Sequence, residues 1–420
     1  MADEIRARVC TRIDEKLQAL SSTILERTIF RVPRQLYEVN EKAYEPEIIS
    51  IGPYHRGKSH LKMMEVHKVR FLRMLLRRTS EHTAELYVAA LRGVVEKACN
   101  CYSESLSIST EDFLEMLVLD GCFIVELIHQ IFDGNMDEYI FRLDLIFSSV
   151  LHDLILFENQ LPFFVLWELF GMMRENERNL YVQCLLLLFY GKIPGRVDVA
   201  YDNTSIRSVK HLLDLVHGNW LPSREVMEDY SRAPKDGNWS FIRSATELKE
   251  AGIRFKKSEG NSLFDIRFRN EVLEIPTIKI LDTIESLYRN VIICEQFENK
   301  SPRYFTDFAK FIDCLINSGK DVKLLCHCRI IDNWLGDDEA VATMFNRLRD
   351  HVNLSPKEDF FYARICNDVN EHYNAPWNKR MGSLRHNYFN TPWAFISFLA
   401  AAFLLLLTLL QTTFTIFPRK

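Results

Sequence analysis

The sequence has 420 residues, of which 47% are hydrophobic and 26% charged, and its 52 basic and 57 acidic residues give a formal net charge of −5. This balance excludes a disordered polyelectrolyte and argues against a general nucleic-acid-binding protein, which usually carries a basic domain. Gly (15) and Pro (13) are fewer than usual, whereas Phe (29) is abundant. The composition therefore predicts a mainly α-helical protein with long packed helices.

Apolar residues recur at helical spacing through most of the chain. They do so in the N-terminal extension, residues 1–27, at Ile13, Leu17, Leu20 and Ile24. Polar residues from Ser109 onward offer capping chemistry before one of the apolar runs that follow. The further helices predicted in chain order are 61–78, 113–131, 150–157, 162–170, 181–190, 209–216, 280–297, 304–317 and 337–349.

The pattern changes near the middle of the chain. Residues 223–238 are polar and contain Pro234 and Gly237, so they are the best candidate for a linker. Beyond them, residues 253–257 and 264–276 alternate apolar with polar side chains, which predicts short antiparallel strands. We therefore expect one large helical domain at 28–390 that carries a small antiparallel β element at about 253–280.

Residues 393–417 contain no charged side chain and are centred on four consecutive leucines, Leu404 to Leu407. At 1.5 Å per residue, a helix of this length extends about 37 Å, enough to cross a hydrocarbon core of about 30 Å. Trp393 and Phe417 would lie at the two membrane interfaces. The sequence thus predicts a single C-terminal transmembrane helix, with the lipid bilayer as its partner.

The expected anchor has two further consequences. Gln411 is a polar group within the span that could hydrogen-bond to a second copy of itself, which would favour homo-oligomers. The N-terminus has no apolar stretch typical of a secretory signal, and the ten cysteines form no CxxC pair and fit a reducing compartment. We therefore expect the bulk of the chain to face the cytosol, at the plasma membrane or an endomembrane.

One segment, residues 52–59, satisfies the GxxxxGK[ST] pattern of phosphate-binding loops. In such loops, backbone N–H groups and the lysine hold the phosphates of a nucleotide. However, Pro53 removes one of these N–H groups, bulky side chains follow it, and the chain lacks the alternating strands and helices of a parallel sheet. A chance match is our main interpretation, and the alternative is a nucleotide-binding enzyme that uses Gly52, Gly57, Lys58 and Ser59.

Cys326, His327 and Cys328 are residues of the types that bind zinc. Neighbouring positions on a helix point about 100° apart and cannot close on one ion, and no nearby pair supplies the remaining ligands. The segment is therefore predicted to be part of a packed helix. The sequence predicts no metal site at Cys326 and Cys328, no bound cofactor and no catalytic residue.

Several blocks of the sequence together resemble the plant domain-of-unknown-function 247 family. This resemblance covers roughly residues 28–417, with the blocks in the family's order. It implies a large helical protein that usually ends in one membrane span, and it implies no catalytic residues. The blocks are Phe30-Arg-Val-Pro, Ile49-Ser-Ile-Gly-Pro-Tyr-His, Leu119-Asp-Gly-Cys-Phe-Ile-Val-Glu, Leu156-Phe-Glu-Asn-Gln-Leu-Pro-Phe-Phe-Val-Leu, Ser244-Ala-Thr-Glu-Leu-Lys-Glu-Ala-Gly-Ile, Glu285-Ser-Leu-Tyr-Arg-Asn, Ile331-Asp-Asn-Trp-Leu-Gly and Tyr388-Phe-Asn-Thr-Pro-Trp-Ala-Phe-Ile-Ser.

Some grass members of that family are implicated as pollen-side determinants of self-incompatibility, so the resemblance implies a role in recognition. We therefore expect a membrane-anchored recognition or signalling protein of plants, without enzymatic activity, that acts on a protein partner not yet identified. A membrane scaffold or adaptor is a second alternative beside the nucleotide-binding enzyme. The sequence does not separate recognition from scaffolding.

Overall fold

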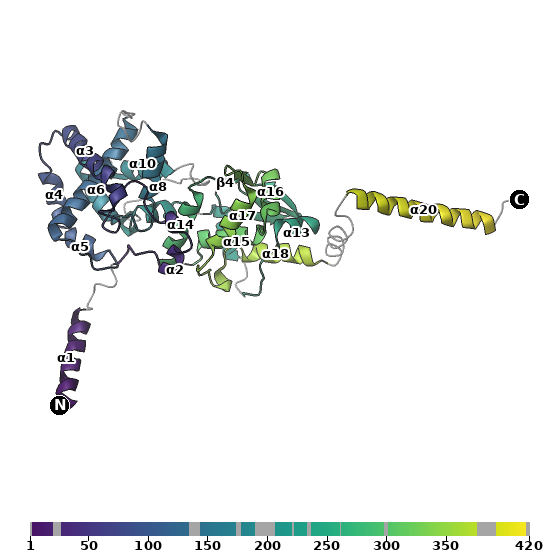
Figure 1. Cartoon of the computed structure of the whole chain (residues 1–420), viewed down its shortest axis with the longest axis horizontal. Helices are drawn as coiled ribbons and strands as arrows, with labels where there is room; N and C mark the ends of the chain where they lie inside the picture. The colour runs from purple at the N-terminus through teal and green to yellow at the C-terminus, as the bar shows by residue number, and fades with distance from the viewer. Residues whose placement is uncertain are drawn as a thin grey trace. The chain divides into compact units, whose positions relative to one another are not determined.

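The computed structural model describes residues 2–19, 27–133, 143–173, 178–189, 206–220, 222–232, 237–260, 262–297, 301–375 and 392–416. The chain divides into two compact units, each of which is mainly helical, as the composition predicts (Figure 1). Unit 1 comprises Met1–Ser223, Leu281–Thr306 and Arg347–Asn353, and unit 2 comprises Arg224–Ile280, Asp307–Asn346 and Leu354–Lys420.

Unit 1 is built from α-helices and a few short 3₁₀ turns. Its elements are α1 (Ala2–Ala19), α2 (Arg34–Tyr37), η2 (Glu41–Ala43), η3 (Ser59–Leu61), α3 (Lys62–Arg78), α4 (Glu85–Arg92), α5 (Val95–Asn100), α6 (Thr110–Phe132), α8 (Asp144–Leu154), α9 (Phe163–Met173), α10 (Arg178–Phe189), η5 (Ile206–Ser208), α11 (Leu212–Gly218) and α14 (Ile284–Phe297).

Helix α6 lies at the centre of unit 1 and packs against α3, α4, α5, α9 and α10. It begins where the sequence predicts, because the Ser109 hydroxyl accepts a hydrogen bond from the Asp112 N–H at 3.0 Å and caps the helix. Phe71 of α3 packs against Phe123 of α6 with ring centroids 4.9 Å apart. The predicted helices 61–78 and 113–131 are thereby confirmed, with their apolar faces buried against each other.

Helix α8 ends at Leu154, three residues before the predicted end at Phe157. Two side chains that follow the helix donate hydrogen bonds to its last carbonyl groups and so terminate it. Asn159 donates to the Asp153 carbonyl at 2.8 Å, and Gln160 donates to the Leu154 carbonyl at 2.9 Å. The chain then reaches α9, which begins directly after Pro162, as the proline predicts.

Unit 2 combines helices with two small sheets. Its helical elements are α12 (Arg224–Arg232), α13 (Ala245–Glu250), α15 (Tyr304–Leu315, which begins in unit 1), α16 (Gly319–His327), α17 (Asp338–Leu348, which ends in unit 1), η6 (Lys357–Asp359), α18 (Ala363–Asn374) and α20 (Pro392–Ile416). Its strands are β1 (Arg254–Lys257), β2 (Arg267–Arg269), β3 (Val272–Ile275), β4 (Ile278–Ile280) and β5 (Ile331–Asn333). Helix α12 lies within the segment 223–238 that the polar composition marks as a candidate linker.

The prediction of a purely antiparallel β element is wrong in its pairing. Strands β2 and β3 do form an antiparallel hairpin, turned by Asn270 and Glu271, whose φ angles are +50° and +63°. However, β1 pairs with β3 in parallel, and β4 pairs in parallel with β5 to form a second sheet. Parallel partners are separated by a crossover along the chain, so local alternation in the sequence does not reveal them.

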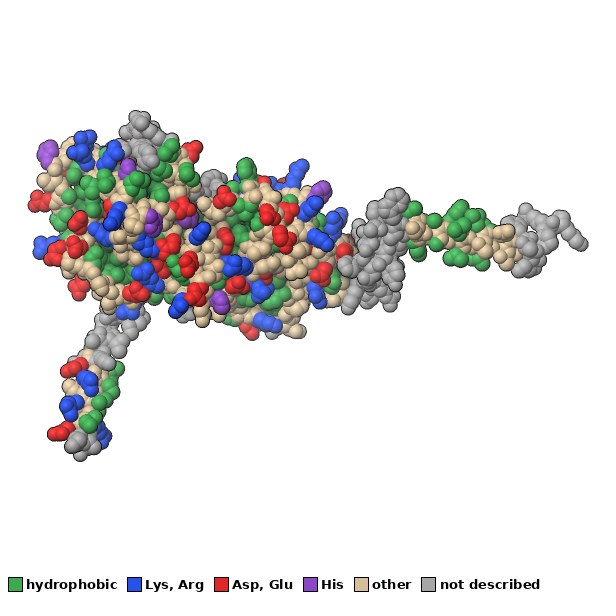
Figure 2. Space-filling model, in the orientation of Figure 1, with side chains coloured by type: hydrophobic (Ala, Val, Ile, Leu, Met, Phe, Trp, Pro, Cys, Tyr) green, Lys and Arg blue, Asp and Glu red, His purple; other side chains and the backbone are tan. Residues whose placement is uncertain are grey.

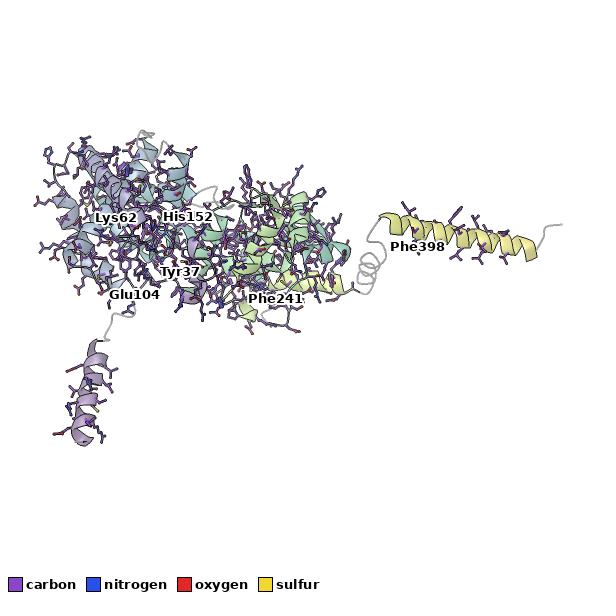
Figure 3. All side chains as sticks on the ribbon, in the orientation of Figure 1. Tyr37, Lys62, Glu104, His152, Phe241 and Phe398 are labelled. Carbon is purple, nitrogen blue, oxygen red and sulfur yellow. The ribbon has the colours of Figure 1, made fainter. Side chains whose placement is uncertain are left out.

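Helices α1 and α20 expose apolar side chains. In α1, the predicted stripe includes Ile13, 49% exposed, and Leu17, 60% exposed, and Figure 2 shows apolar atoms along one side of this helix. The predicted positions Leu20 and Ile24 lie outside the described residues. In α20, every residue from Ile396 to Thr412 is exposed, and Figure 3 shows side chains, Phe398 among them, projecting on different sides of the helix.

Among the residues that the structure describes, no helix combines the length and the hydropathy of a membrane span. The predicted transmembrane helix at 393–417 is therefore not supported by this structure and stays a prediction. Leu404, Leu407 and Gln411 are exposed residues of α20. The side chain of Trp393 and the whole of Phe417 lie outside the described residues.

Candidate functional site

The segment that matches the phosphate-loop pattern is an irregular loop followed by η3 and α3, and the described residues 27–51 before it contain no strand. Gly52 and Gly57 have φ angles of +78° and +88°. The Gly52 N–H donates to a carboxylate oxygen of Asp120 at 2.8 Å, and the Lys58 ammonium pairs with Glu45. The groups that would hold phosphate are thus bonded within the protein, and Ser59 begins η3.

Buried polar side chains form hydrogen bonds with the residues that directly precede this loop and hold them against the core of unit 1. Asp153, fully buried, accepts hydrogen bonds from the N–H groups of Glu47, Ile48 and Ile49 at 2.8–2.9 Å. Asn159 accepts the N–H of Ile51 at 2.7 Å. These bonds satisfy backbone donors that no strand or helix would otherwise pair. The segment therefore has a structural role in the fold.

One set of side chains has the order of a serine-hydrolase triad. His152 Nε2 lies 2.8 Å from the Ser286 hydroxyl, and His152 Nδ1 lies 3.0 Å from Asp153. However, the Ser286 hydroxyl donates its proton to the Ala43 carbonyl at 2.7 Å, and all three members of the set are buried. A hydroxyl committed to a backbone carbonyl in the interior is not available to attack a substrate. We interpret the set as part of the internal hydrogen-bonding network.

The predicted helix at Cys326 and Cys328 is present as α16. Cys326 lies in its last turn and Cys328 follows as the C-terminal cap. Both side chains are partly exposed, and burial raises the pKa of each thiol above its ordinary value. The structure brings no histidine or carboxylate to this pair in a metal-binding arrangement among the described residues.

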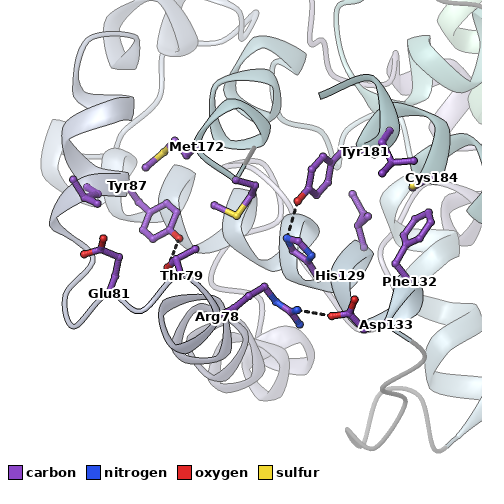
Figure 4. A pocket seen from close by; sticks show the side chains of 14 residues that line it. Arg78, Thr79, Glu81, Tyr87, His129, Phe132, Asp133, Met172, Tyr181 and Cys184 are labelled. Atoms are coloured by element: carbon purple, nitrogen blue, oxygen red, sulfur yellow. Dashed lines mark hydrogen bonds and ion pairs between the residues drawn. The ribbon is translucent and has the colours of Figure 1, made fainter. Parts of the chain in front are cut away.

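A cavity of about 580 Å³ opens in unit 1 at the ends of several helices (Figure 4). This volume is within the usual range for small-molecule sites of about 300–1,000 Å³. The cavity is the candidate functional site of this unit. Its lining residues are Arg78, Thr79, Glu81, Leu86, Tyr87, Ile128, His129, Phe132, Asp133, Met172, Met173, Leu180, Tyr181 and Cys184.

The cavity is framed by the packing of α6 against its neighbours. Gly121 allows α9 to approach α6 closely, since a Cβ at position 121 would lie 2.4 Å from Leu169 Cδ1. The last turns of α6 and α9 then supply Phe132 and Met172 to the cavity. Helix α10 returns along them and contributes Leu180 and Tyr181. The apolar wall thus comes from residues far apart in the sequence.

The charged side of the cavity is centred on Arg78 at the end of α3. Its guanidinium pairs with Asp133 (Figure 4). It also binds both oxygens of Glu126 at 3.2 Å. Burial lowers the pKa of Arg78, but the two carboxylates outweigh this effect and raise it, so the guanidinium stays charged. Among the described residues, no cation pairs with Glu81. Among the described lining residues, Glu81 is therefore the carboxylate that a bound molecule could pair with.

The cavity is also lined by hydroxyl, imidazole and thiol groups. The Tyr181 hydroxyl lies 2.8 Å from His129 Nε2, and the Tyr87 hydroxyl lies 3.4 Å from Thr79 Oγ1 (Figure 4). Burial raises the pKa of Tyr87 and also raises that of the Cys184 thiol to about 12. Because the thiolate is the reactive form of cysteine, Cys184 is a poor nucleophile near neutral pH. These groups can donate and accept hydrogen bonds, which suits binding.

The family described as DUF247, a plant protein of unknown function, matches residues 29–407. The chain belongs to the DUF247 family. This DUF247 protein is 32% identical to the UPF0481 protein At3g47200 of Arabidopsis thaliana, over 92% of this chain and 86% of that protein. It is 22% identical to a second Arabidopsis thaliana protein of the UPF0481 group, At3g02645, over 95% of this chain and 92% of that one. No solved structure matches it.

The comparison confirms the family resemblance drawn from the sequence blocks. Three of those blocks meet in the buried polar network of this DUF247 protein, through Gly52, Asp120 and Asn159. Sequence reasoning did not identify the cavity. The only feature of the sequence that marks the cavity is the apolar character of the helix ends that supply Phe132, Met172 and Leu180. Such residues are equally typical of a hydrophobic core.

Proposed function

We propose that this DUF247 protein is a non-enzymatic recognition protein that binds a small amphipathic molecule in the cavity of unit 1. The observation that carries the proposal is the cavity itself, with an apolar wall facing a charged side. The apolar wall would hold a hydrocarbon body, and the few polar groups would fix its orientation. Glu81 favours a ligand whose polar end is a cation or a hydrogen-bond donor, because its carboxylate can only accept.

The groups that line the cavity support binding rather than catalysis. Nucleophilic catalysis needs a nucleophile that a neighbouring group activates, and for cysteine the reactive form is the thiolate. In the cavity, His129 is engaged with the Tyr181 hydroxyl, and the Cys184 thiol has a pKa of about 12. Ligand binding without chemical change is therefore the activity that these residues suit best.

We further propose that α20 anchors the protein in a membrane and that both units face the cytosol. The apolar, uncharged sequence of 393–417 supports the anchor, and so does the exposure of apolar side chains along α20, such as Phe398, 57% exposed, and Leu405, 67% exposed. Surfaces of this kind are rarely left in water. A bilayer would cover them on all sides of the helix.

The binding proposal is tested by thermal unfolding of the full-length protein with three matched series of compounds. The series are arylalkyl amines, alcohols and carboxylates that share one hydrocarbon skeleton. A ligand that binds only the folded state raises the unfolding temperature by mass action. We expect the amines and alcohols to raise it and the carboxylates to do so least, because Glu81 repels an anion.

Two variants of α10 make this test specific to the cavity. Leu180→Trp fills the cavity, whereas Leu187→Trp places the same side chain on an exposed site of the same helix that does not line the cavity. Stabilisation is expected to persist in Leu187→Trp and to disappear in Leu180→Trp. Equal stabilisation of both variants, or no stabilisation of the natural protein by any series, would contradict a ligand site in this cavity.

A further inference from the structure

Three side chains that can bind a metal ion come together in unit 1, and none of them lines the cavity. Asp214 and His217 lie on α11, and Cys294 lies on α14, which packs against α11. Their potential ligand atoms all lie within 4.8 Å of one another. An aspartate and a histidine three residues apart share one face of a helix, and the cysteine faces them from the second helix. No other such group occurs among the described residues.

The carboxylate of Glu295, which is not one of these three residues, fixes the orientation of the His217 side chain. Its Nε2 lies 3.1 Å from a carboxylate oxygen of Glu295. With Nε2 directed at this carboxylate, Nδ1 is the ring nitrogen that would bind an ion. A carboxylate behind a histidine in this way is typical of metal sites, where it sets the tautomer and makes the other nitrogen a better ligand.

Glu295 is itself held firmly. One of its oxygens accepts the N–H of Phe305 at 2.9 Å, and the other accepts the N–H and the hydroxyl of Thr306 at 2.8 Å. The His217 ring also packs against Phe305, with ring centroids 6.1 Å apart. The carboxylate and the imidazole are therefore ordered before any ion arrives, which lowers the cost of binding one.

The two other side chains also have environments that suit a metal ligand. One oxygen of Asp214 accepts the N–H of Lys210 at 2.7 Å, which holds the carboxylate in position with its second oxygen available to an ion. Cys294 is 3% exposed, whereas Asp214 and His217 are partly exposed, so an ion could enter from the α11 side. The buried thiol would give the site a ligand that water cannot easily replace.

We propose that Asp214, His217 and Cys294 form a zinc-binding site that links α11 to α14. A mixed set of one oxygen, one nitrogen and one sulfur suits Zn²⁺, and a water molecule would complete the tetrahedron. The Cys294 thiol would lose its proton to solvent on binding, so the carboxylate and thiolate together balance the charge of the ion. Tetrahedral bonds of about 2.0–2.3 Å require the three ligand atoms to draw together by only about 1 Å.

Cobalt substitution of the full-length protein tests this site, because Co²⁺ takes the place of Zn²⁺ and is visible by absorption. We expect one equivalent of Co²⁺ to give the intense d–d bands of a tetrahedral site and a thiolate-to-cobalt charge-transfer band. Zn²⁺ should displace the cobalt and remove both signals. The absence of a charge-transfer band in the natural protein would overturn the proposal.

Matched variants assign the ligands. Cys294→Ser should abolish the charge-transfer band, and Asp214→Asn, which keeps an acceptor for the Lys210 N–H, should weaken Zn²⁺ binding at least about tenfold without unfolding the protein. The double variant Cys326→Ser/Cys328→Ser should leave the spectrum unchanged. A band that survives Cys294→Ser, or Zn²⁺ affinity that is unchanged in Asp214→Asn, would contradict the site.

Discussion

Lys68 and Asp120 form an ion pair in the interior of unit 1, with 2.6 Å between the ammonium nitrogen and a carboxylate oxygen. The Lys68 side chain is 1% exposed and that of Asp120 is fully buried. Lys68 also donates to the Ser50 carbonyl at 2.5 Å, and Asp120 accepts the Gly52 N–H. One pair of charges thus connects α3 and α6 to the loop that precedes α3, and its contacts with Ser50 and Gly52 offset part of the cost of burying it.

Removing one member of this pair is expected to destabilise unit 1 strongly. Lys68→Met leaves the Asp120 carboxylate buried without its cation, which should lower the free energy of unfolding by about 3–5 kcal/mol. Lys62→Met removes the same charge from an exposed site on the same helix and should change it by less than about 0.5 kcal/mol. Urea unfolding of the full-length variants measures both values. Equal effects would mean that the buried pair has no special role.

Gly52 is expected to be far more sensitive to substitution than Gly57, although both have a positive φ. A Cβ at position 52 would lie 2.5 Å from the Gln160 carbonyl oxygen, whereas one at position 57 meets nothing within 4 Å. Gly57→Ala should therefore cost about 1–2 kcal/mol, the strain of the left-handed conformation alone. Gly52→Ala adds a clash with backbone and should cost about 2–5 kcal/mol. Denaturant midpoints that coincide for the two variants would refute this.

His55 is expected to make the stability of the protein depend on pH. Burial, reinforced by the charge of Lys58, lowers the pKa of His55 from 6.5 to about 4, and this outweighs the opposite effect of the Glu45 carboxylate. Between these values the unfolded chain binds a proton that the folded protein does not. The free energy of unfolding should therefore rise with pH from about 4 to 6.5, by about 3 kcal/mol at most, and stay constant above.

The variant His55→Gln isolates this contribution. Its free energy of unfolding, measured by urea at a series of pH values, should rise less steeply between about pH 4 and 6.5 than that of the natural protein. Parallel curves for the two proteins would show that His55 titrates alike in the folded and unfolded states.

The helices of this fold could be predicted from the sequence better than its polar interior. The apolar faces of α3 and α6 follow the 3.6-residue period, and the cap at Ser109 is a local signal. By contrast, Asp153 and Asn159 bond to backbone groups more than 100 residues away. A polar residue inside an apolar run gives no sign of where its distant partner lies, so its role could not be predicted.

The cavity and the metal-ligand group could not be predicted from the sequence for the same reason. The cavity is lined by residues at the ends of α3, α6, α9 and α10. Its volume depends on how closely these helices pack, for example at Gly121. The metal-ligand group needs α11 and α14, about 80 residues apart, to be neighbours. Two motifs could be seen in the sequence, at 52–59 and 326–328. They lie in a loop and at the end of a helix, where their residues have structural roles.

The proposed anchor predicts how the protein behaves in membranes. Extraction of sealed membranes with alkaline carbonate should leave the natural protein in the pellet, since a spanning helix is not released by charge repulsion. The double variant Leu404→Arg/Leu407→Arg should move it to the supernatant, because a charge at the bilayer centre costs about 2.5–3.5 kcal/mol by insertion scales. Ile5→Arg in α1 is the control and should not release it.

Protease treatment of the same sealed membranes reports orientation. With both units on the cytosolic side, they should be digested without detergent. Protection of the units until detergent is added would contradict this orientation while leaving the anchor itself intact.

Protection of Cys184 from alkylation would show directly whether a small molecule binds in the cavity of unit 1. Cys184 lines the cavity, whereas Cys366 is equally buried in unit 2, and burial raises the pKa of both thiols. Mass spectrometry would follow the slow alkylation of each thiol by an excess of a small uncharged reagent at mildly alkaline pH, where more of each thiol is ionised, with and without the compound that stabilises the protein most. A compound that binds in the cavity should slow the alkylation of Cys184 alone. An unchanged rate at Cys184, or equal slowing at Cys366, would contradict it.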